Sequence, residues 1–164
     1  MNNIVLCGFM GCGKSSVGRV LAELLGRELI DTDEYIEQVR GVSISQIFER
    51  DGEDKFRDIE HDACVALSKR QGLVIATGGG ALTFERNVEA FRNDTVIFMD
   101  VPFDEIARRI GSCADRPLFR DESSARDLYE RRLPLYRAAA DCTVYAVGDK
   151  SEIANRIIKM LRVR

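Results

Sequence analysis

The chain has 164 residues, of which 45% are hydrophobic and 31% are charged. That size and composition can bury one core, and they exclude disordered and fibrous proteins. Lys and Arg number 24 against 27 Asp and Glu, a net charge of −3, which argues against a nucleic-acid partner held by bulk positive charge.

Cysteine and histidine usage limits the kinds of site that the chain can build. The five cysteines are Cys7, Cys12, Cys64, Cys113 and Cys142. Their spacings fit neither a CxxC metal site nor a secreted disulfide framework, so we expect free thiols in a reducing, cytoplasmic compartment. The single histidine, His61, excludes a site of two or more histidines. We see no signal peptide and no apolar run long enough for a membrane span, and expect no membrane contact.

Short apolar runs alternate with helical patterns from the N-terminus onward. Residues 4–7 predict a buried strand. Apolar residues then recur at helical spacing over 17–25, and Gly26 stands where a C-cap glycine is expected. A second strand is predicted at 29–31, followed by a helix that ends at Gly41.

The alternation continues through the middle of the chain. Residues 43–46, Ser-Ile-Ser-Gln, have capping-box spacing and predict a short helix, with a longer one over about 54–70. A third strand is predicted at 73–77 and a fourth at 95–100. Pro102 is expected to open the next helix at a favoured early position.

The last third of the chain completes the pattern. Residues 111–123 are polar and irregular, and a helix through Leu128, Arg132 and Leu135 follows. The segment 142–145 predicts a fifth strand, before a final helix. Five strand–helix units predict an α/β fold: a five-stranded parallel sheet with helices on both faces, in three layers.

Residues 8–15, GFMGCGKS, match the P-loop pattern G-x-x-x-x-G-K-[ST] at every fixed position, between a buried strand and an amphipathic helix. Glycines let backbone N–H groups point at phosphate oxygens, and the helix N-terminus adds partial positive charge. Lys14 is expected to reach the β- and γ-phosphates of ATP, and the Ser15 hydroxyl to bind Mg²⁺. The predicted loop residues at the nucleotide are Gly11, Cys12, Gly13, Lys14, Ser15 and Ser16.

Two strands end in carboxylates that can serve a metal ion. Asp100 ends the strand at 95–100, where a generic Walker B acid is expected. Asp31 and Asp33 stand at the carboxyl end of the second strand, an edge at which doubly wound sheets bind ligands. One of this pair can hold Mg²⁺ through water while the other accepts a proton from an attacking hydroxyl. Spacing alone fits a turn and a helix N-cap at Asp33 equally well.

Several further segments follow the P-loop in order. They are Asp31-Thr32-Asp33, Ile47-Phe48 ahead of Gly52-Glu53, Phe56-Arg57-Asp58-Ile59-Glu60, Gly78-Gly79-Gly80, Arg116-Pro117-Leu118 and Arg132-Leu-Pro-Leu-Tyr136. Together they resemble the shikimate kinase family, from the first strand to about Tyr136. The resemblance implies transfer of the ATP γ-phosphoryl group to the 3-hydroxyl of shikimate, with Mg²⁺, in aromatic amino acid biosynthesis. Shikimate is a small ring that carries a carboxylate and three hydroxyls.

The resemblance implies a role for each matching residue. Asp33 is implied as the base on the ring hydroxyls, and Asp31 as a neighbour of Mg²⁺ through water. Asp100 thereby loses the metal-side role and becomes a strand-end residue or a helix cap. Arg57 and Arg132 are implied as the clamp on the substrate carboxylate, since a guanidinium can hold a carboxylate by paired hydrogen bonds.

Ordinary structural alternatives exist for the clamp and for the glycine run. Arg57 lies three or four residues from Glu53 and Glu60, a spacing that also fits helix-surface ion pairs. In the family, the counterpart of Glu60 orients the arginine. Gly79 and Gly80 are implied as substrate-binding through close backbone approach, whereas a plain turn is the alternative.

The remaining implied parts are pocket walls, a lid and an adenine contact. Phe48 and Phe56 resemble apolar walls, although each also fits a simple core position. Residues 111–123 resemble a mobile lid, from which Arg116 would stabilise charge on the transferring phosphoryl group. Arg109 matches a position that stacks on adenine, and the arginine next to it competes for this role.

Two other functions stay open from the residues. One is another small-molecule P-loop kinase, acting on gluconate or a nucleoside monophosphate. The other is a nucleotide-gated regulatory module without catalysis, against which Lys14, Asp33 and Arg116 together argue. We expect one shikimate kinase-like domain over residues 1–164, with a substrate-binding segment at about 33–60. We expect a monomer, since no long exposed heptad pattern demands a partner.

Overall fold

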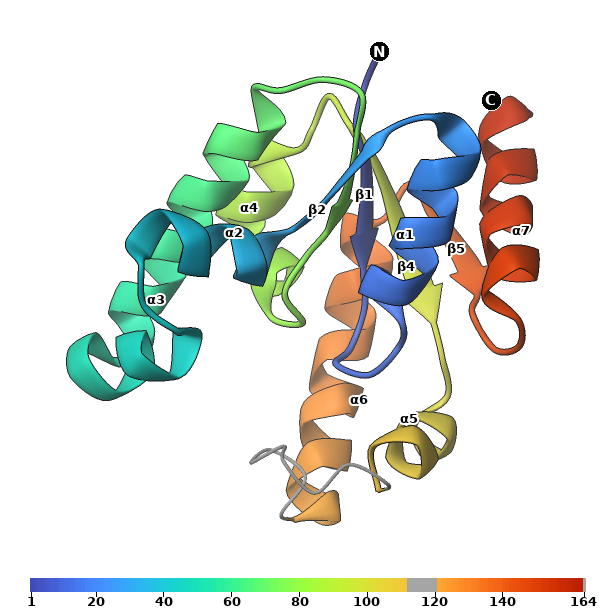
Figure 1. The fold of residues 1–164 in the computed structure, drawn as a ribbon. Coiled ribbons are helices and arrows are strands. Elements are labelled where there is room, and N and C mark those ends of the chain that lie inside the picture. The colour runs from blue at the N-terminus through green and yellow to red at the C-terminus, as the bar shows by residue number, and fades with distance from the viewer. Residues whose placement is uncertain (112–120, 164) are drawn as a thin grey trace.

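Five parallel strands form the centre of the computed structural model, which describes residues 1–111 and 121–163. The strands are β1 (Ile4–Cys7), β2 (Glu28–Asp31), β3 (Leu73–Ala76), β4 (Thr95–Asp100) and β5 (Cys142–Tyr145). Their order in the sheet is β2-β3-β1-β4-β5 (Figure 1). Leu6 pairs with Ala76 on one side and with Ile97 on the other, so β1 is central. The P-loop after β1 therefore lies next to the ends of β3 and β4.

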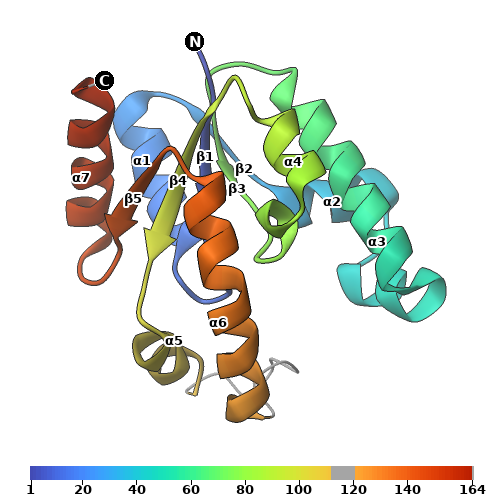
Figure 2. The ribbon, with the colours of Figure 1, turned by 180° about the vertical axis from the view of Figure 1, so that it is seen from behind.

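Helices cover both faces of this sheet. They are α1 (Lys14–Leu25), α2 (Thr32–Arg40), α3 (Ile44–Ser68), the 3₁₀-helix η1 (Ala81–Thr83), α4 (Glu85–Ala90), α5 (Phe103–Ile110), α6 (Glu122–Ala139) and α7 (Lys150–Arg162). Helices α1 and α7 pack on one face, and α4 and α6 lie on the other (Figures 1 and 2). Helices α2 and α3 extend beyond the β2 edge. This arrangement confirms the three-layer α/β fold.

Burial explains why the strands read as unbroken apolar runs. All four residues of β1 and all four of β3 are buried. A parallel strand covered by helices on both faces has no solvent side, so the period-two alternation disappears. Strand β2, at the sheet edge, is partly exposed instead.

Local signals mark the helix ends as expected. Gly26 (φ 62°) and Gly41 (φ 67°) end α1 and α2 in the left-handed conformation that glycine adopts most easily. Ser43 and Gln46 form the expected capping box at the start of α3. Gly52, with φ 83° and ψ 173°, breaks α3, so the short helix and the longer one expected from the sequence are two arms of one bent element.

Helices α2 and α3 have a small core of their own. Its buried members are Ile36, Ile47, Phe56, Ile59 and Ala63. These residues come from both helices and from both arms of α3. The cluster therefore holds the region that follows β2 in a fixed shape beside the main sheet.

A few boundaries differ from the sequence expectations. Strand β3 ends at Ala76, one residue before the expected end. Pro102 is the N-cap of α5 and so lies just ahead of the helix. Helices η1 and α4 were not expected, because elements this short carry too little periodicity.

Most of the expected lid, residues 112–120, lies outside the described residues. Within the described residues, no helix combines the length and apolarity that crossing a membrane needs.

Candidate active site

The P-loop turns sharply between β1 and α1. Gly8 has φ 146°, and a Cβ there would lie 2.9 Å from Cys12 Sγ and 3.0 Å from the Met99 carbonyl oxygen. Gly13, at φ 92°, directly precedes the first residue of α1. The fixed glycines are thus required by conformation and by space, and the loop delivers the α1 N-terminus to the cavity beside it.

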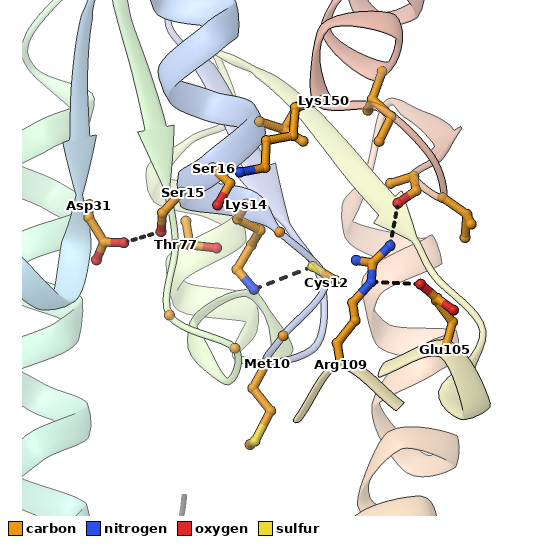
Figure 3. Close-up of a pocket in the computed structure, with 18 of the residues that line it drawn as sticks. Met10, Cys12, Lys14, Ser15, Ser16, Asp31, Thr77, Glu105, Arg109 and Lys150 are labelled. Carbon is orange, nitrogen blue, oxygen red and sulfur yellow. Dashed lines mark hydrogen bonds and ion pairs between the residues drawn. The ribbon is translucent and has the colours of Figure 1, made fainter. Parts of the chain in front are cut away.

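A cavity of about 800 Å³ opens above this loop. Its lining runs from the P-loop to Asp31 and Asp33, to Thr77 and the glycines that follow it, and to α5 and the β5–α7 loop. In Figure 3, Asp31 and Arg109 lie on opposite sides of the P-loop. The cavity is large enough for a nucleotide and joins the ends of β1, β2 and β3.

Lys14 lies within the loop that carries it. Its Nζ donates hydrogen bonds to the carbonyl oxygens of Gly8 (2.7 Å) and Phe9 (3.0 Å), and it lies 3.6 Å from Cys12 Sγ (Figure 3). Lys14 is only 9% exposed. A buried ammonium group is thereby placed next to the backbone nest that a P-loop offers to phosphate.

Ser15 and Asp31 form a pair of oxygen donors at the end of β2. The Ser15 hydroxyl donates to Asp31 Oδ2 at 2.6 Å (Figure 3). Asp31 Oδ1 accepts from the backbone N–H groups of Asp33 and Glu34, so Asp31, and not Asp33, is the N-cap of α2. Mg²⁺ prefers oxygen ligands and commonly binds through one or two protein groups plus water and phosphate, which this pair fits.

Asp100 stands apart from this pair. Its Oδ2 lies 4.0 Å from Arg137 Nη2, and it is not among the described residues that line the cavity. Pro102 is the residue that caps α5, so Asp100 is a strand-end residue and not a helix cap.

Asp33 is a partly buried carboxyl group in the cavity, and its surroundings raise its pKa. Burial is the main cause that raises its pKa to about 6, and the negative charges of Asp31 and Glu60 raise it further, while Lys14 opposes them. A carboxyl group with a pKa in this range is well matched to accept a proton near neutral pH.

Arg57 is held by two glutamates of its own helix. Its Nη1 lies 2.9 Å from Glu60 Oε2, and its Nη2 lies 3.3 Å from Glu53 Oε1. The Glu60 side chain is 1% exposed and that of Arg57 is 13% exposed. Burial raises the pKa of Glu60, although Arg57 opposes that shift. Arg57 Nε is buried and has no hydrogen-bond partner among the described residues.

The glycine run after β3 brings the candidate side chains together. A Cβ on Gly78 would lie 2.9 Å from Asp33 Oδ1, and a Cβ on Gly80 would lie 2.8 Å from both Nη atoms of Arg57. The corresponding position on Gly79 is 3.8 Å from Arg132 Nη1. Three segments distant in the sequence thus meet along one backbone stretch without side chains.

Arg109 is the α5 arginine that faces the P-loop. Its Nη1 lies 3.9 Å from the Cβ position of Gly13, and its Nε lies 2.9 Å from Glu105 Oε1 (Figure 3). The Arg108 side chain also pairs with Glu105 but is 73% exposed. The geometry therefore favours Arg109 over its neighbour as a nucleotide contact.

Comparison with known proteins places this geometry in a family. A sequence model of the family described as "Shikimate kinase" matches residues 10–162. A shikimate kinase of Thermodesulfovibrio yellowstonii is 39% identical over 97% of this chain and 94% of its own length. One from a Synechococcus strain is 43% identical over 97% of this chain and 84% of its own length.

The chain belongs to the shikimate kinase family. Among solved structures, the Acinetobacter baumannii shikimate kinase in complex with shikimate superimposes with a TM-score of 0.93 at 39% identity, covering 99% of this chain and 94% of that one. A gluconokinase of Sinorhizobium meliloti reaches a TM-score of 0.63 at 19% identity, which shows a shared fold alone. The family resemblance seen in the motifs is confirmed.

Three side chains hold the glycine run and the residue after it in place. Gly78 N donates to Thr32 Oγ1 at 2.9 Å, and Asn87 Nδ2 donates to the Ala81 carbonyl oxygen at 2.8 Å. The Tyr136 hydroxyl donates to the Gly79 carbonyl oxygen. Thr32 and Tyr136 lie in segments that carry the family resemblance, although neither was singled out for this contact, and Asn87 carries no signal in the sequence.

The two phenylalanines expected as pocket walls differ in their burial. Phe56 belongs to the small α2–α3 core, and its ring lies 4.7 Å from that of Phe48, which is 37% exposed. The cavity lining also includes Glu105 and Lys150, which sequence patterns did not indicate. Arg116 lies outside the described residues.

Proposed function

We propose that the two ends of the cavity hold the two substrates of one phosphoryl transfer, with ATP on the P-loop and shikimate at the glycine run. The reaction of this enzyme is the ATP-dependent phosphorylation of shikimate in aromatic amino acid biosynthesis. The observation that carries the residue assignment is the meeting of Asp33, Arg57 and Arg132 along residues 78–80, beside the P-loop.

On the acceptor side, Asp33 accepts the proton of the attacking 3-hydroxyl of shikimate. Its pKa of about 6 supports this role, because the carboxylate is ionised at neutral pH yet basic enough to take a proton. Arg57 and Arg132 hold the shikimate carboxylate through their guanidinium groups. Gly79 and Gly80 allow the ring to approach the backbone closely.

On the phosphoryl side, the P-loop backbone and Lys14 bind the β- and γ-phosphates. The position of Lys14 Nζ among the loop carbonyl oxygens supports this role. Ser15 and Asp31 hold Mg²⁺, which when bound with ATP neutralises charge on the transferring group. Arg109 contacts the adenine from α5.

Several finer features remain predictions from the sequence. We propose that residues 1–164 form one domain, with substrate-binding residues over about 33–60 and a lid over about 111–123 that brings Arg116 to the phosphoryl group. We also propose that the enzyme acts as a monomer in the cytoplasm and without nucleic acid. Size-exclusion chromatography coupled to light scattering tests whether the enzyme is a monomer.

The acceptor specificity tests the proposal directly. ADP release is measured with Mg-ATP and shikimate, gluconate, a nucleoside monophosphate or no acceptor. We expect rapid release with shikimate alone. Release with another acceptor would contradict the assignment of Asp33, Arg57 and Arg132, while binding of ATP without release for any acceptor would favour a regulatory module.

The clamp is tested by Arg57→Ala, with Arg50→Ala as a matched control. A charged hydrogen bond contributes about 1.5–3 kcal/mol, so we expect the KM for shikimate to rise about 10- to 100-fold. The KM for ATP should change little. Arg50 lies on the same helix, and its side chain is 70% exposed, so its loss should leave both constants unchanged. An unchanged KM for shikimate in Arg57→Ala would refute the clamp.

A further inference from the structure

Phe84 lies beside the clamp arginine, at the junction of η1 and α4. The centre of its ring is 5.1 Å from Arg57 Cζ, and that of Phe56 is 5.2 Å away. Phe56 is adjacent to Arg57 in the sequence and buried in the small α2–α3 core. Phe84 comes from a different segment and is 37% exposed, so core packing alone does not explain it.

The contacts of Arg57 divide between its edge and the aromatic rings. Glu60 and Glu53 bind its two Nη atoms. A cation near an aromatic ring is attracted by the ring quadrupole, more strongly when water is excluded, and the Arg57 side chain is only 13% exposed.

Phe84 is also tied to the backbone that the arginine packs against. Phe84 N donates to the Ala81 carbonyl oxygen at 3.4 Å, and the Thr83 hydroxyl donates to the Gly80 carbonyl oxygen at 2.7 Å. The same Gly80 has its Cβ position 2.8 Å from the Arg57 Nη atoms. One short turn therefore fixes both the backbone beside the guanidinium group and the ring near it.

We propose that Phe84 is a positioning residue for shikimate recognition: its ring holds the Arg57 guanidinium group in the orientation that binds the substrate carboxylate. Phe84 acts through Arg57 and has no part in proton or phosphoryl transfer. This inference rests on the proposed role of Arg57 as the clamp. The turn between η1 and α4, two elements that were not expected from the sequence, would then contribute to the affinity for shikimate.

The test compares Phe84→Leu, which removes the ring, with Phe84→Tyr, which keeps it. From the usual strength of a cation–π contact, we expect Phe84→Leu to raise the KM for shikimate about three- to tenfold. The kcat and the KM for ATP should stay within about twofold, since no contact to the P-loop is lost. Phe84→Tyr, which keeps the ring, should have the KM for shikimate of the wild type. Tyr145→Leu removes an exposed ring from β5 and controls for general loss of aromatic surface.

A double variant separates this inference from the clamp itself. If Phe84 acts through Arg57, then Phe84→Leu should add no further loss of shikimate binding in an Arg57→Ala background. The inference would be overturned if the effects of Phe84→Leu and Arg57→Ala on shikimate binding added fully in the double variant. It would also be overturned if Phe84→Leu raised the KM for ATP as much as the KM for shikimate, or if Phe84→Tyr bound shikimate as weakly as Phe84→Leu. If Arg57→Ala binds shikimate normally, the clamp assignment fails first. If Arg57→Ala is impaired and Phe84→Leu is not, only the role of Phe84 fails. Phe84→Met replaces Phe84→Leu if the latter does not fold.

Discussion

Asp33→Asn should make this enzyme more stable and nearly inactive. Asn keeps the shape of the neutral carboxyl group but cannot accept the proton of the attacking hydroxyl. In the folded protein the pKa of Asp33 is about 6 in place of its ordinary 3.8, chiefly because of burial. Above pH 6 the folded protein must therefore hold an ionised group that its surroundings disfavour.

The pKa difference sets the size of the stability gain. A rise from 3.8 to about 6 corresponds to about 3 kcal/mol of unfolding free energy. Because Asp33 is half-buried and water screens part of the effect, we expect about 2 kcal/mol. The cost to the wild type is absent below pH 3.8, where the carboxyl is neutral in both states. It grows between pH 3.8 and 6 and is complete above pH 6, so the gain of Asp33→Asn should follow the same course.

Urea and thermal unfolding from pH 4 to pH 8 measure the change in stability, and turnover assays over the same range measure the loss of activity. At pH 8, about 2 kcal/mol raises the melting temperature by about 4 to 8 °C in a chain of this size. Loss of a general base lowers kcat by about 10²- to 10⁴-fold, while Mg-ATP binding stays nearly intact. In the wild type, kcat/KM for shikimate should fall below pH 6. An Asn variant that turns over normally, or that is less stable at pH 8, would refute the reasoning.

Three further variants test separate parts of the site. Gly80→Ala places a Cβ 2.8 Å from the clamp guanidinium group at an ordinary φ of −96°, so the KM for shikimate should rise severalfold while the KM for ATP does not, in steady-state assays. Arg109→Ala should raise the KM for ATP about two- to fivefold by loss of a cation–π contact, whereas an equal effect of Arg108→Ala would contradict the choice between them. Asp31→Asn should raise the Mg²⁺ concentration for half-maximal rate about tenfold, whereas Asp100→Asn should not; the reverse order would restore the generic Walker B assignment.

The fold could be predicted from the sequence because its signals are local and repeated. Each buried strand is an apolar run, and glycines at 26 and 41 end their helices in a conformation that few other residues adopt. Even the break in α3 follows from Gly52. The P-loop is a contiguous pattern, so its identity and its place between β1 and α1 could be read directly.

The arrangement of the acceptor site could not be predicted in the same way. The choice of Asp31 as the α2 N-cap depends on a hydrogen bond that spacing leaves open between two aspartates. The hydrogen bond from Gly78 N to Thr32 Oγ1 joins two segments far apart in the chain, and spacing along the sequence does not reveal it. Phe84 belongs to a turn too short to show periodicity, and its nearness to Arg57 arises from the tertiary fold.

One buried carboxylate couples the two tasks of the acceptor site. Glu60 binds Arg57 through Oε2, while its Oε1 lies 3.2 Å from the Cβ position of Gly78, next to Asp33. Its charge raises the pKa of Asp33 and at the same time holds the clamp. Glu60 therefore influences both the proposed proton acceptance and the proposed carboxylate binding, although burial remains the larger cause of the raised pKa of Asp33.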